Sequence, residues 1–175
     1  MLFRSLSHEG LVLGWSDRDR LIEQTGKPDF EYRINKYEPL VYNEKKFDDA
    51  FRAIEELIHL AQDHDFKIIF FINPLYDQIY INNAQPLFAA KRRLANLTDY
   101  YDFSGFNTIT TNPLNYYDRS HYRFGVGRMI TDRIFGDDKN TPDGFGILVT
   151  RKNVEAHLAK QKSDLDRYLK KYHLQ

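Results

Sequence analysis

The sequence predicts a layered α/β domain. Amphipathic helical segments alternate along the chain with short apolar and aromatic runs that are typical of buried strands. Such alternation is typical of folds in which helices cover a sheet and connect parallel strands by right-handed crossovers. At 175 residues the chain fits one domain of ordinary size, so we expect residues 1–175 to form a single unit.

The first 45 residues have no regular hydrophobic period and are expected to form an irregular lead-in of loops and short helices. Glycine and proline interrupt any long element in this part of the chain, at Gly10, Gly14, Gly26, Pro28 and Pro39. The regular part of the domain is therefore expected to begin near residue 47.

Apolar residues after this lead-in recur at three- and four-residue steps and so share one face of a helix. The members of this face are Phe47, Ala50, Phe51, Ile54, Leu57, Ile58 and Ala61. The helix is predicted to end near residues 63–65. The apolar run at 67–72, closed by Asn73 and Pro74, then predicts a strand buried on both faces.

A second helix and a second strand are predicted to follow. Pro86 suits the first turn of a helix that continues through Leu97, because a proline at that position loses no helical hydrogen bond. Residues 100–103 predict a short strand, and the segment 108–115, rich in Thr, Asn and Pro, predicts a loop.

The last part of the chain predicts a helix, a short strand and a terminal helix. The first helix starts just after His121, ends at Gly136 in left-handed geometry, and is defined by Val126, Met129, Ile130 and Ile134. The strand covers 147–149. The terminal helix, 151–173, carries many lysines and aspartates, so we expect it to be mostly solvated and to pack weakly against the domain edge.

The composition argues against several classes of protein. Lys plus Arg equals Asp plus Glu at 25 each, so no net charge favours nucleic acid, and no nucleic-acid partner is expected. The apolar runs are far shorter than the roughly 20 residues of a membrane-spanning helix. Residues 1–10 lack the apolar core of a signal peptide. The absence of cysteine excludes a thiol nucleophile and leaves the compartment open.

Asp118 and His121 form the candidate catalytic pair. They lie in a loop between a predicted strand and a predicted helix, where α/β folds place their working groups. A histidine can exchange a proton near neutral pH, and an aspartate three residues earlier can fix its tautomer and stabilise the imidazolium. The structural alternative, which the spacing alone favours, is that Asp118 bonds nearby amides of the turn while His121 is an ordinary half-buried residue.

The surrounding segments resemble the last block of SGNH (GDSL-like) hydrolases in order and spacing: Tyr100–Gly105, Asn115–Tyr122 and Val126–Gly127. The resemblance extends over most of the chain and implies a three-layer, flavodoxin-like sheet with flanking helices. It implies that His121 is a general base toward a serine, supported by Asp118. It also implies ester substrates, often acetyl groups on cell-envelope glycans, no cofactor or metal, and a location outside the cytoplasmic membrane.

The chain departs from that family in lacking a recognisable nucleophile block. The similar segment Gly14–Ser16 follows an apolar run, but too few residues separate Ser16 from the helix at Phe47 for the further strands that the family needs, since each βαβ unit takes about 30 residues or more. Ser16 is predicted to cap a helix over 17–22. The chain is therefore expected to supply only the later strands of the sheet, with a serine from an N-terminal segment or partner chain.

The remaining candidates are predicted to be structural. Residues 63–65, Asp-His-Asp, are adjacent at a helix end and point in different directions, so a solvated terminus is expected rather than a metal site. His59 and His157 have no evident ligand role. An aromatic group could include a platform for sugar rings, although most of it is expected to be core: Tyr100, Tyr101, Phe103, Phe106, Tyr116, Tyr117, Tyr122 and Phe124.

Two functions follow as hypotheses. The first is the C-terminal, base-supplying portion of an SGNH-type ester hydrolase or O-acetyl transferase that acts on envelope glycans and is nearly inactive alone. Without a serine hydroxyl and paired oxyanion donors, the largest catalytic contribution would be missing. The alternative is a non-catalytic binding or assembly module that keeps the fold and the aromatic residues.

Overall fold

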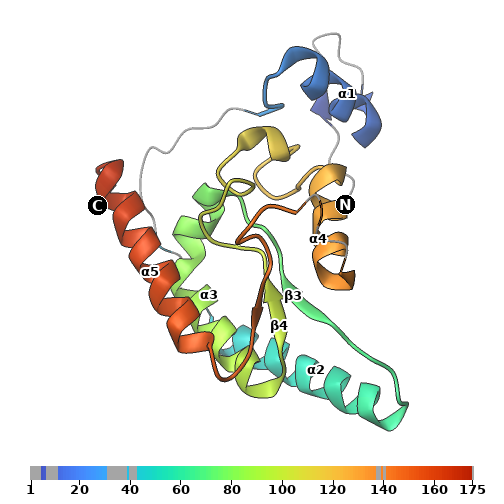
Figure 1. Ribbon diagram of the computed structural model, residues 1–175, viewed down its shortest axis with the longest axis vertical. Coiled ribbons are helices and arrows are strands. Elements are labelled where there is room, and N and C mark those ends of the chain that lie inside the picture. The colour runs from blue at the N-terminus through green and yellow to red at the C-terminus, as the bar shows by residue number, and fades with distance from the viewer. Residues whose placement is uncertain are drawn as a thin grey trace.

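The computed structural model describes residues 5–6, 12–30, 39, 43–136, 139 and 141–174 (Figure 1). Gly10 and part of the predicted lead-in lie outside this range. The elements in chain order are β1 (Ser5–Leu6), β2 (Val12–Leu13), α1 (Trp15–Thr25), α2 (Glu44–Asp63), β3 (Phe70–Ile72), α3 (Asp77–Leu97), β4 (Tyr100–Asp102), the 3-10 turn η1 (Pro113–Asn115), α4 (Phe124–Phe135), β5 (Ile147–Val149) and α5 (Val154–Lys171). The predicted α/β class is confirmed, and the sheet is mixed.

The main sheet has three strands in the order β3-β4-β5. β3 and β4 are parallel and are joined by α3, as the alternation of helix and strand predicts, and β4 pairs with β5 antiparallel. The antiparallel pairing arises because Ile147 lies opposite Asp102, so β5 starts at the edge where β4 ends. β1 and β2 form a separate antiparallel pair.

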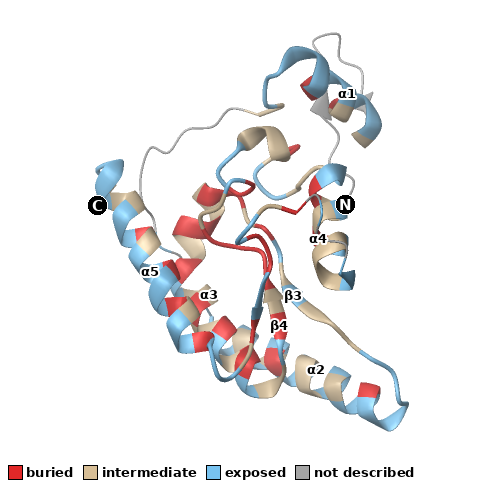
Figure 2. Cartoon of the chain, viewed as in Figure 1, coloured by how far each residue is buried: buried red, intermediate tan, exposed pale blue. Residues whose placement is uncertain are grey.

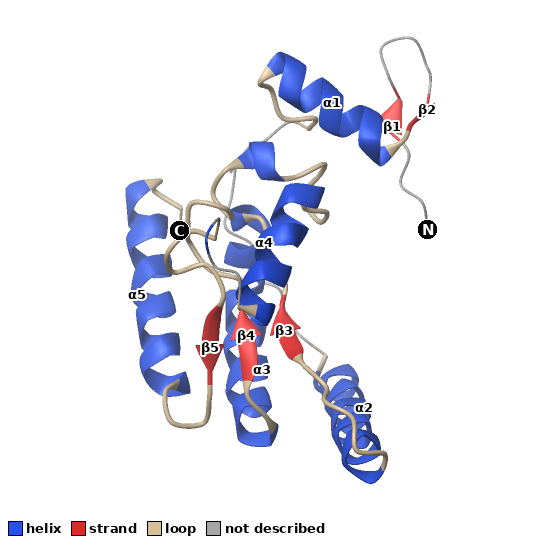
Figure 3. Ribbon diagram, turned by 45° about the vertical axis from the view of Figure 1, so that its right-hand side comes forward, coloured by secondary structure: helices blue, strands red, loops and turns tan. Residues whose placement is uncertain are grey.

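Helices pack against both faces of this small sheet (Figure 3). Tyr100 belongs to the larger apolar core, which α3 and α5 share with β4 and β5. Tyr101, the next residue of β4, packs instead against a smaller core that contains Val126 and Ile130 of α4. Alternate residues of a strand point to opposite faces, so β4 lies between the two cores (Figure 2).

The helix predicted from Phe47 is confirmed as α2. Its N-cap Asn43 accepts a hydrogen bond from the Lys46 backbone N–H at 3.0 Å, which satisfies one of the first unpaired helix donors. Only Phe51 and Ala61 of α2 are buried, so much of the periodic face is partly exposed. The strand after it covers Phe70–Ile72, shorter than the predicted 67–72.

The predicted start of the next helix at Pro86 is wrong, because α3 begins at Asp77 and carries Pro86 in its interior. A proline inside a helix removes one backbone hydrogen bond. Burial of Tyr80, Ala84 and Phe88, spaced four residues apart on one face, keeps the helix continuous through this position. Tertiary packing therefore overrides the local preference of proline.

The last two helices lie where the pattern predicts them, but α5 packs more firmly than expected. α4 ends at Gly136 in left-handed geometry, with φ of 92° and the Gly136 N–H bonded to the Asp132 carbonyl. α5 buries a stripe of four residues, Val154, Leu158, Gln161 and Leu165, so the prediction of a weakly packed terminal helix is wrong. None of the described helices is both long and apolar enough to cross a membrane.

Three buried tyrosines make the fold sensitive to alkaline pH. Burial raises the pKa of Tyr80, Tyr100 and Tyr116 above the ordinary tyrosine value, because the phenolate would lose its hydration. Their contribution to stability is complete below about pH 10, the unfolded pKa, and is lost as pH rises above it. In a titration followed at 295 nm, we expect these phenols to ionise only as far-UV circular dichroism is lost. Ionisation of all 12 tyrosines without unfolding would contradict this.

Candidate functional site

The segment 116–123 is anchored at the end of β3. Tyr116, which is buried, donates a hydrogen bond from its hydroxyl to the Pro74 carbonyl at 3.0 Å. Tyr116 and Tyr122 form an isolated antiparallel bridge, and the Tyr117 N–H donates to the His121 carbonyl at 2.8 Å. These contacts close a tight loop over residues 117–121, and the Tyr116 hydroxyl bonds its base to the chain two residues after β3.

This loop brings Asp118 and His121 together. His121 Nδ1 lies 2.9 Å from each oxygen of the Asp118 carboxylate. Asp118 Oδ1 also accepts the backbone N–H groups of Ser120 at 2.7 Å and His121 at 3.0 Å. The two side chains are 30 % and 42 % exposed. Asp118 therefore stabilises the turn, as the structural alternative predicts, and also orients the imidazole.

Helix α1 packs beside the pair, which the sequence did not predict. The Trp15 ring lies 5.6 Å from the His121 ring and 4.7 Å from the Tyr117 ring. The guanidinium of Arg18, which is buried, lies over both aromatic rings and donates to the Tyr117 carbonyl and to Asp29. An imidazole next to an indole is partly shielded from water.

Ser16 is not the helix cap that the sequence predicts. The N-cap of α1 is Gly14, and Ser16 lies exposed in the first turn. The preceding strand β2 pairs with β1 and not with the main sheet. The strand before Gly14 is therefore followed by a helix, but this strand does not belong to the three-stranded sheet.

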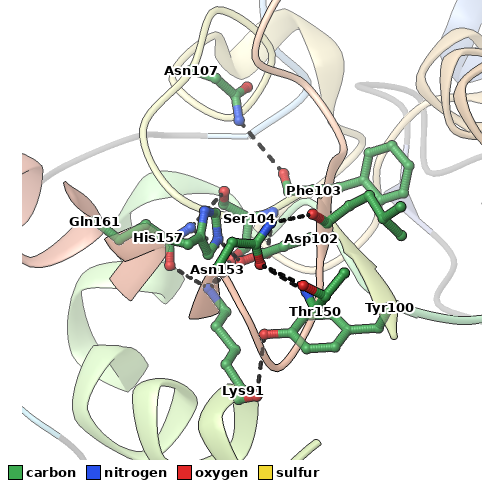
Figure 4. Close-up of polar contacts among 11 residues, drawn as sticks. Lys91, Tyr100, Asp102, Phe103, Ser104, Asn107, Thr150, Asn153, His157 and Gln161 are labelled. Atoms are coloured by element: carbon green, nitrogen blue, oxygen red, sulfur yellow. Dashed lines mark hydrogen bonds and ion pairs between the residues drawn. The ribbon is translucent and has the colours of Figure 1, made fainter. Parts of the chain in front are cut away.

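A second polar cluster lies at the carboxyl end of β4, around the fully buried Asp102 (Figure 4). Its Oδ1 accepts the backbone N–H of Ser104 at 3.0 Å and the Ser104 hydroxyl at 2.7 Å. Its Oδ2 lies 2.8 Å from Lys91 Nζ, 2.7 Å from His157 Nε2 and 3.1 Å from Gln161 Nε2. The cluster joins α3, β4 and α5.

The cluster supplies one acceptor for each N–H donor of the Lys91 ammonium. This ammonium has three N–H donors, and three acceptors lie within reach: Asp102 Oδ2 at 2.8 Å, and Ser104 Oγ and Gln161 Oε1 at 2.7 Å each. Burial lowers the pKa of the Lys91 ammonium, and the Asp102 charge opposes that shift. Three acceptors around one nitrogen fit the charged form.

Burial alone would raise the pKa of the Asp102 carboxyl. The Lys91 charge and the hydrogen bonds from His157, Lys91 and Ser104 outweigh it and hold this pKa far below its usual range. Asp102 is therefore ionised at neutral pH. Because the Ser104 hydroxyl donates to Asp102 and accepts from Lys91, it is held as a structural group rather than as a free nucleophile.

The acidic partner of His157 is Asp102, which lies 55 residues earlier in the chain and which the sequence did not identify. Two signals pointed to this cluster. Asp102 ends β4 directly after the aromatic residues Tyr100 and Tyr101, and Gln161 lies within the apolar stripe of α5, where a polar residue needs partners. Neither signal identifies the partner residue.

The other candidates lie apart from these two clusters. His59 and residues 63–65 are exposed on α2 or at its end, and no group of three or more His, Cys, Asp or Glu in the described ranges is placed to hold a metal. The aromatic group is largely core. Tyr100, Phe103, Tyr116 and Tyr117 are buried, whereas Phe124 is 65 % exposed.

The chain thus defines a mixed α/β protein with a partly exposed Asp–His pair and a separate buried charge cluster. Comparisons with protein-family models, with curated proteins and with solved structures found no match.

Proposed function

We propose that this chain supplies the acid–base half of an acyl-transfer site, in an ester hydrolase or O-acyltransferase of the SGNH type. The observation that carries the proposal is the contact between His121 Nδ1 and both Asp118 oxygens at 2.9 Å, at a partly exposed position in the loop 116–123. An ionised carboxylate at Nδ1 stabilises the imidazolium that forms when Nε2 accepts a proton. His121 is then the general base and Asp118 the residue that orients it.

The chemistry needs a hydroxyl from elsewhere. His121 Nε2 takes the proton of a serine hydroxyl while that oxygen attacks the acyl carbon, and it returns the proton to the oxygen of the departing alcohol. The serine ester is then cleaved by water, or by an acceptor hydroxyl in a transferase, with the same proton transfers. Ser104 is not this serine, because its hydroxyl is already bonded to Asp102 and Lys91.

An incomplete sheet agrees with a supplied nucleophile segment. β3 has one neighbour, β4, among the described strands, and Phe71 in its centre is 41 % exposed. A strand with an open edge can pair with another segment. In the proposed assembly an N-terminal segment or partner chain extends the sheet beyond β3 toward a three-layer arrangement and brings the serine. The resemblance to SGNH hydrolases favours acylated envelope glycans as substrates and a location outside the cytoplasmic membrane.

Hydrolysis of p-nitrophenyl acetate tests this proposal. The chain is assayed alone and as a complex with the polypeptide encoded directly upstream, if that polypeptide has an apolar strand ending in Gly-x-Ser. We expect activity near background for the chain alone and turnover by the complex. His121→Gln should lower kcat/KM about 10²- to 10⁴-fold, the usual contribution of a general base. Asp118→Asn should cause a smaller loss, and His59→Gln, on exposed α2, should cause none.

A specific contact favours the alternative, a non-catalytic binding or assembly module. The His121 ring packs against Trp15, and Arg18 lies over the Trp15 ring and bonds the Tyr117 carbonyl. The imidazole therefore also belongs to the interface between α1 and the loop 116–123. If the complex forms but does not hydrolyse the ester, or if His121→Gln leaves turnover unchanged while α1 detaches, the binding module is the correct function.

A further inference from the structure

His157 lies in the wall of a cleft that is separate from the Asp118–His121 loop. The cleft has a volume of about 340 Å³ and lies between the loop 104–107, the turn 144–147 and α5. This volume is at the lower end of the range for small-molecule sites, about 300–1,000 Å³. Figure 4 shows His157 and Gln161 reaching from α5 toward Asp102. The floor of the cleft is thus the buried charge cluster.

The cluster fixes the orientation of the imidazole. His157 Nε2 lies 2.7 Å from Asp102 Oδ2, and the side chain is 11 % exposed. Nε2 therefore carries a proton and donates it to a carboxylate that stays ionised. Nδ1 has no hydrogen-bond partner within the described part of the chain, so it is the ring nitrogen left for a ligand. A carboxylate ligand can bond Nδ1 only when this nitrogen also carries a proton, because a deprotonated imidazole nitrogen is an acceptor.

Most other polar side chains that line the cleft already form hydrogen bonds within the protein. Asn107 Oδ1 accepts the backbone N–H groups of Ile109 and Thr110 at 3.0 Å each. Asn153 accepts from the Thr150 N–H at 2.7 Å and donates to the Leu148 carbonyl at 3.0 Å. Little hydrogen-bonding capacity remains for a ligand with many hydroxyls. The cleft therefore suits a ligand with one strongly polar group.

The charges around the cleft favour an anion. Lys91 and Asp102 neutralise each other, and Lys160 at the rim is paired with Asp164 at 2.8 Å. A second hollow continues along α5 past Lys160 and Asp164 and adds Arg167 and Lys171, with no further carboxylate. The loop 104–107 and the turn 144–147 contribute no ionisable lining residue. Among the residues that line the two hollows, Asp164 is the single carboxylate, whereas Lys160, Arg167 and Lys171 are cationic. Protonated His157 would add a further positive charge to this surface.

We propose that this cleft binds a small carboxylate with an apolar body. The carboxylate accepts a hydrogen bond from protonated His157 Nδ1 and forms an ion pair with Lys160. The Lys160 side chain is 74 % exposed, so it can reorient toward the ligand. The body packs against Phe106 and Ile147, which line the cleft. The site is independent of the acyl-transfer function, because it uses neither His121 nor Asp118.

Binding is expected to weaken as pH rises, since the ligand needs the imidazolium form of His157. Once that form is lost, affinity falls by up to tenfold for each further pH unit. The charged groups that face His157 are Asp102, whose pKa is held far below its usual range so that it stays ionised, Lys91 beside it, and the Lys160–Asp164 pair at the rim.

Benzoate titrations followed by ¹H–¹⁵N NMR test the proposal. At pH 6 we expect saturable shifts of the Gly144, Ile147 and His157 amides, and affinity at least tenfold weaker at pH 8. Benzyl alcohol, with the same ring and no charge, should bind at least tenfold more weakly than benzoate at pH 6. His157→Gln should remove the pH dependence, and Lys160→Met should weaken binding several-fold while keeping it. His59→Gln is the matched control and should change neither.

Three results would overturn the proposal: equal binding of benzyl alcohol, affinity that does not change between pH 6 and 8, or shifts centred on residues 116–123. Retention of pH-dependent binding in a folded His157→Gln variant would also overturn it. If this variant does not fold, as shown by lost amide dispersion, the wild-type pH series, the neutral probe and Lys160→Met still decide the matter.

Discussion

Replacement of Lys91 by methionine is expected to destabilise the fold by about 3–5 kcal/mol, the usual cost of removing one partner from a buried ion pair. Methionine keeps the length and apolar body of lysine. It leaves Asp102 buried with no counter-charge, and it leaves the carbonyl of the Gln161 amide without its donor. Urea unfolding followed by circular dichroism measures the difference in the free energy of unfolding.

Arg92→Met, at the next position of α3, is the matched control. Arg92 forms a two-pronged pair with Glu155 at 2.6 and 2.9 Å, but both side chains are at least half exposed, so water already screens their charges. We expect a much smaller change in stability from this variant. Adding Asp102→Asn to Lys91→Met should recover part of the loss, because it removes the unpaired charge. Equal effects of Lys91→Met and Arg92→Met would contradict the importance of the buried cluster.

Gly146→Ala is the second variant with a large expected effect, a loss of about 2–5 kcal/mol from left-handed backbone strain and overpacking together. Gly146 has φ of +81°. A Cβ built there would lie 2.7 Å from Arg133 Cγ and 2.9 Å from Phe103 Cζ, and would overlap Phe103 Cε1. Phe103 is fully buried in the smaller core, so its ring has little room to move.

Gly144→Ala separates the two causes, because Gly144 has a similar φ of +76° and open space where an alanine methyl group would lie. It should lose only the backbone contribution, about 1–2 kcal/mol. Thermal unfolding of both variants measures the difference. If the two variants are equally stable, the close approach of Gly146 to Phe103 and Arg133 does not matter for the fold.

The elements that the sequence predicted well are those set by local pattern. The periodicity from Phe47 predicted α2, and Gly136 marked the end of α4. The start of α3 was missed because Pro86 is a strong local signal, whereas burial of Tyr80 and Ala84 depends on residues distant in sequence. The antiparallel direction of β5 could not be predicted from a local pattern either, because it depends on the edge at which the chain returns to the sheet.

The same distinction applies to the candidate sites. Asp118 and His121 are three residues apart, which is short enough for a tight turn to bring them together, although the spacing alone favoured the structural alternative. The cluster around Asp102 brings together residues as far apart as Lys91 and Gln161, and only the packing of α5 against the sheet creates it. A charged terminal helix looked solvated because its lysines and aspartates outnumber the few residues that it buries.

The docking of α1 has a consequence for the order in which the chain folds during synthesis. Arg18 bonds the Tyr117 carbonyl 99 residues away, and Arg123 bonds Glu23 at 2.9 Å across 100 residues. An isolated helix of 11 residues is marginal in water. Residues 15–25 leave the ribosome long before their binding surface exists, so this helix has no partner to stabilise it until residues 117–123 have also been made. Helix α1 therefore docks only after the segment 116–123 has been synthesised.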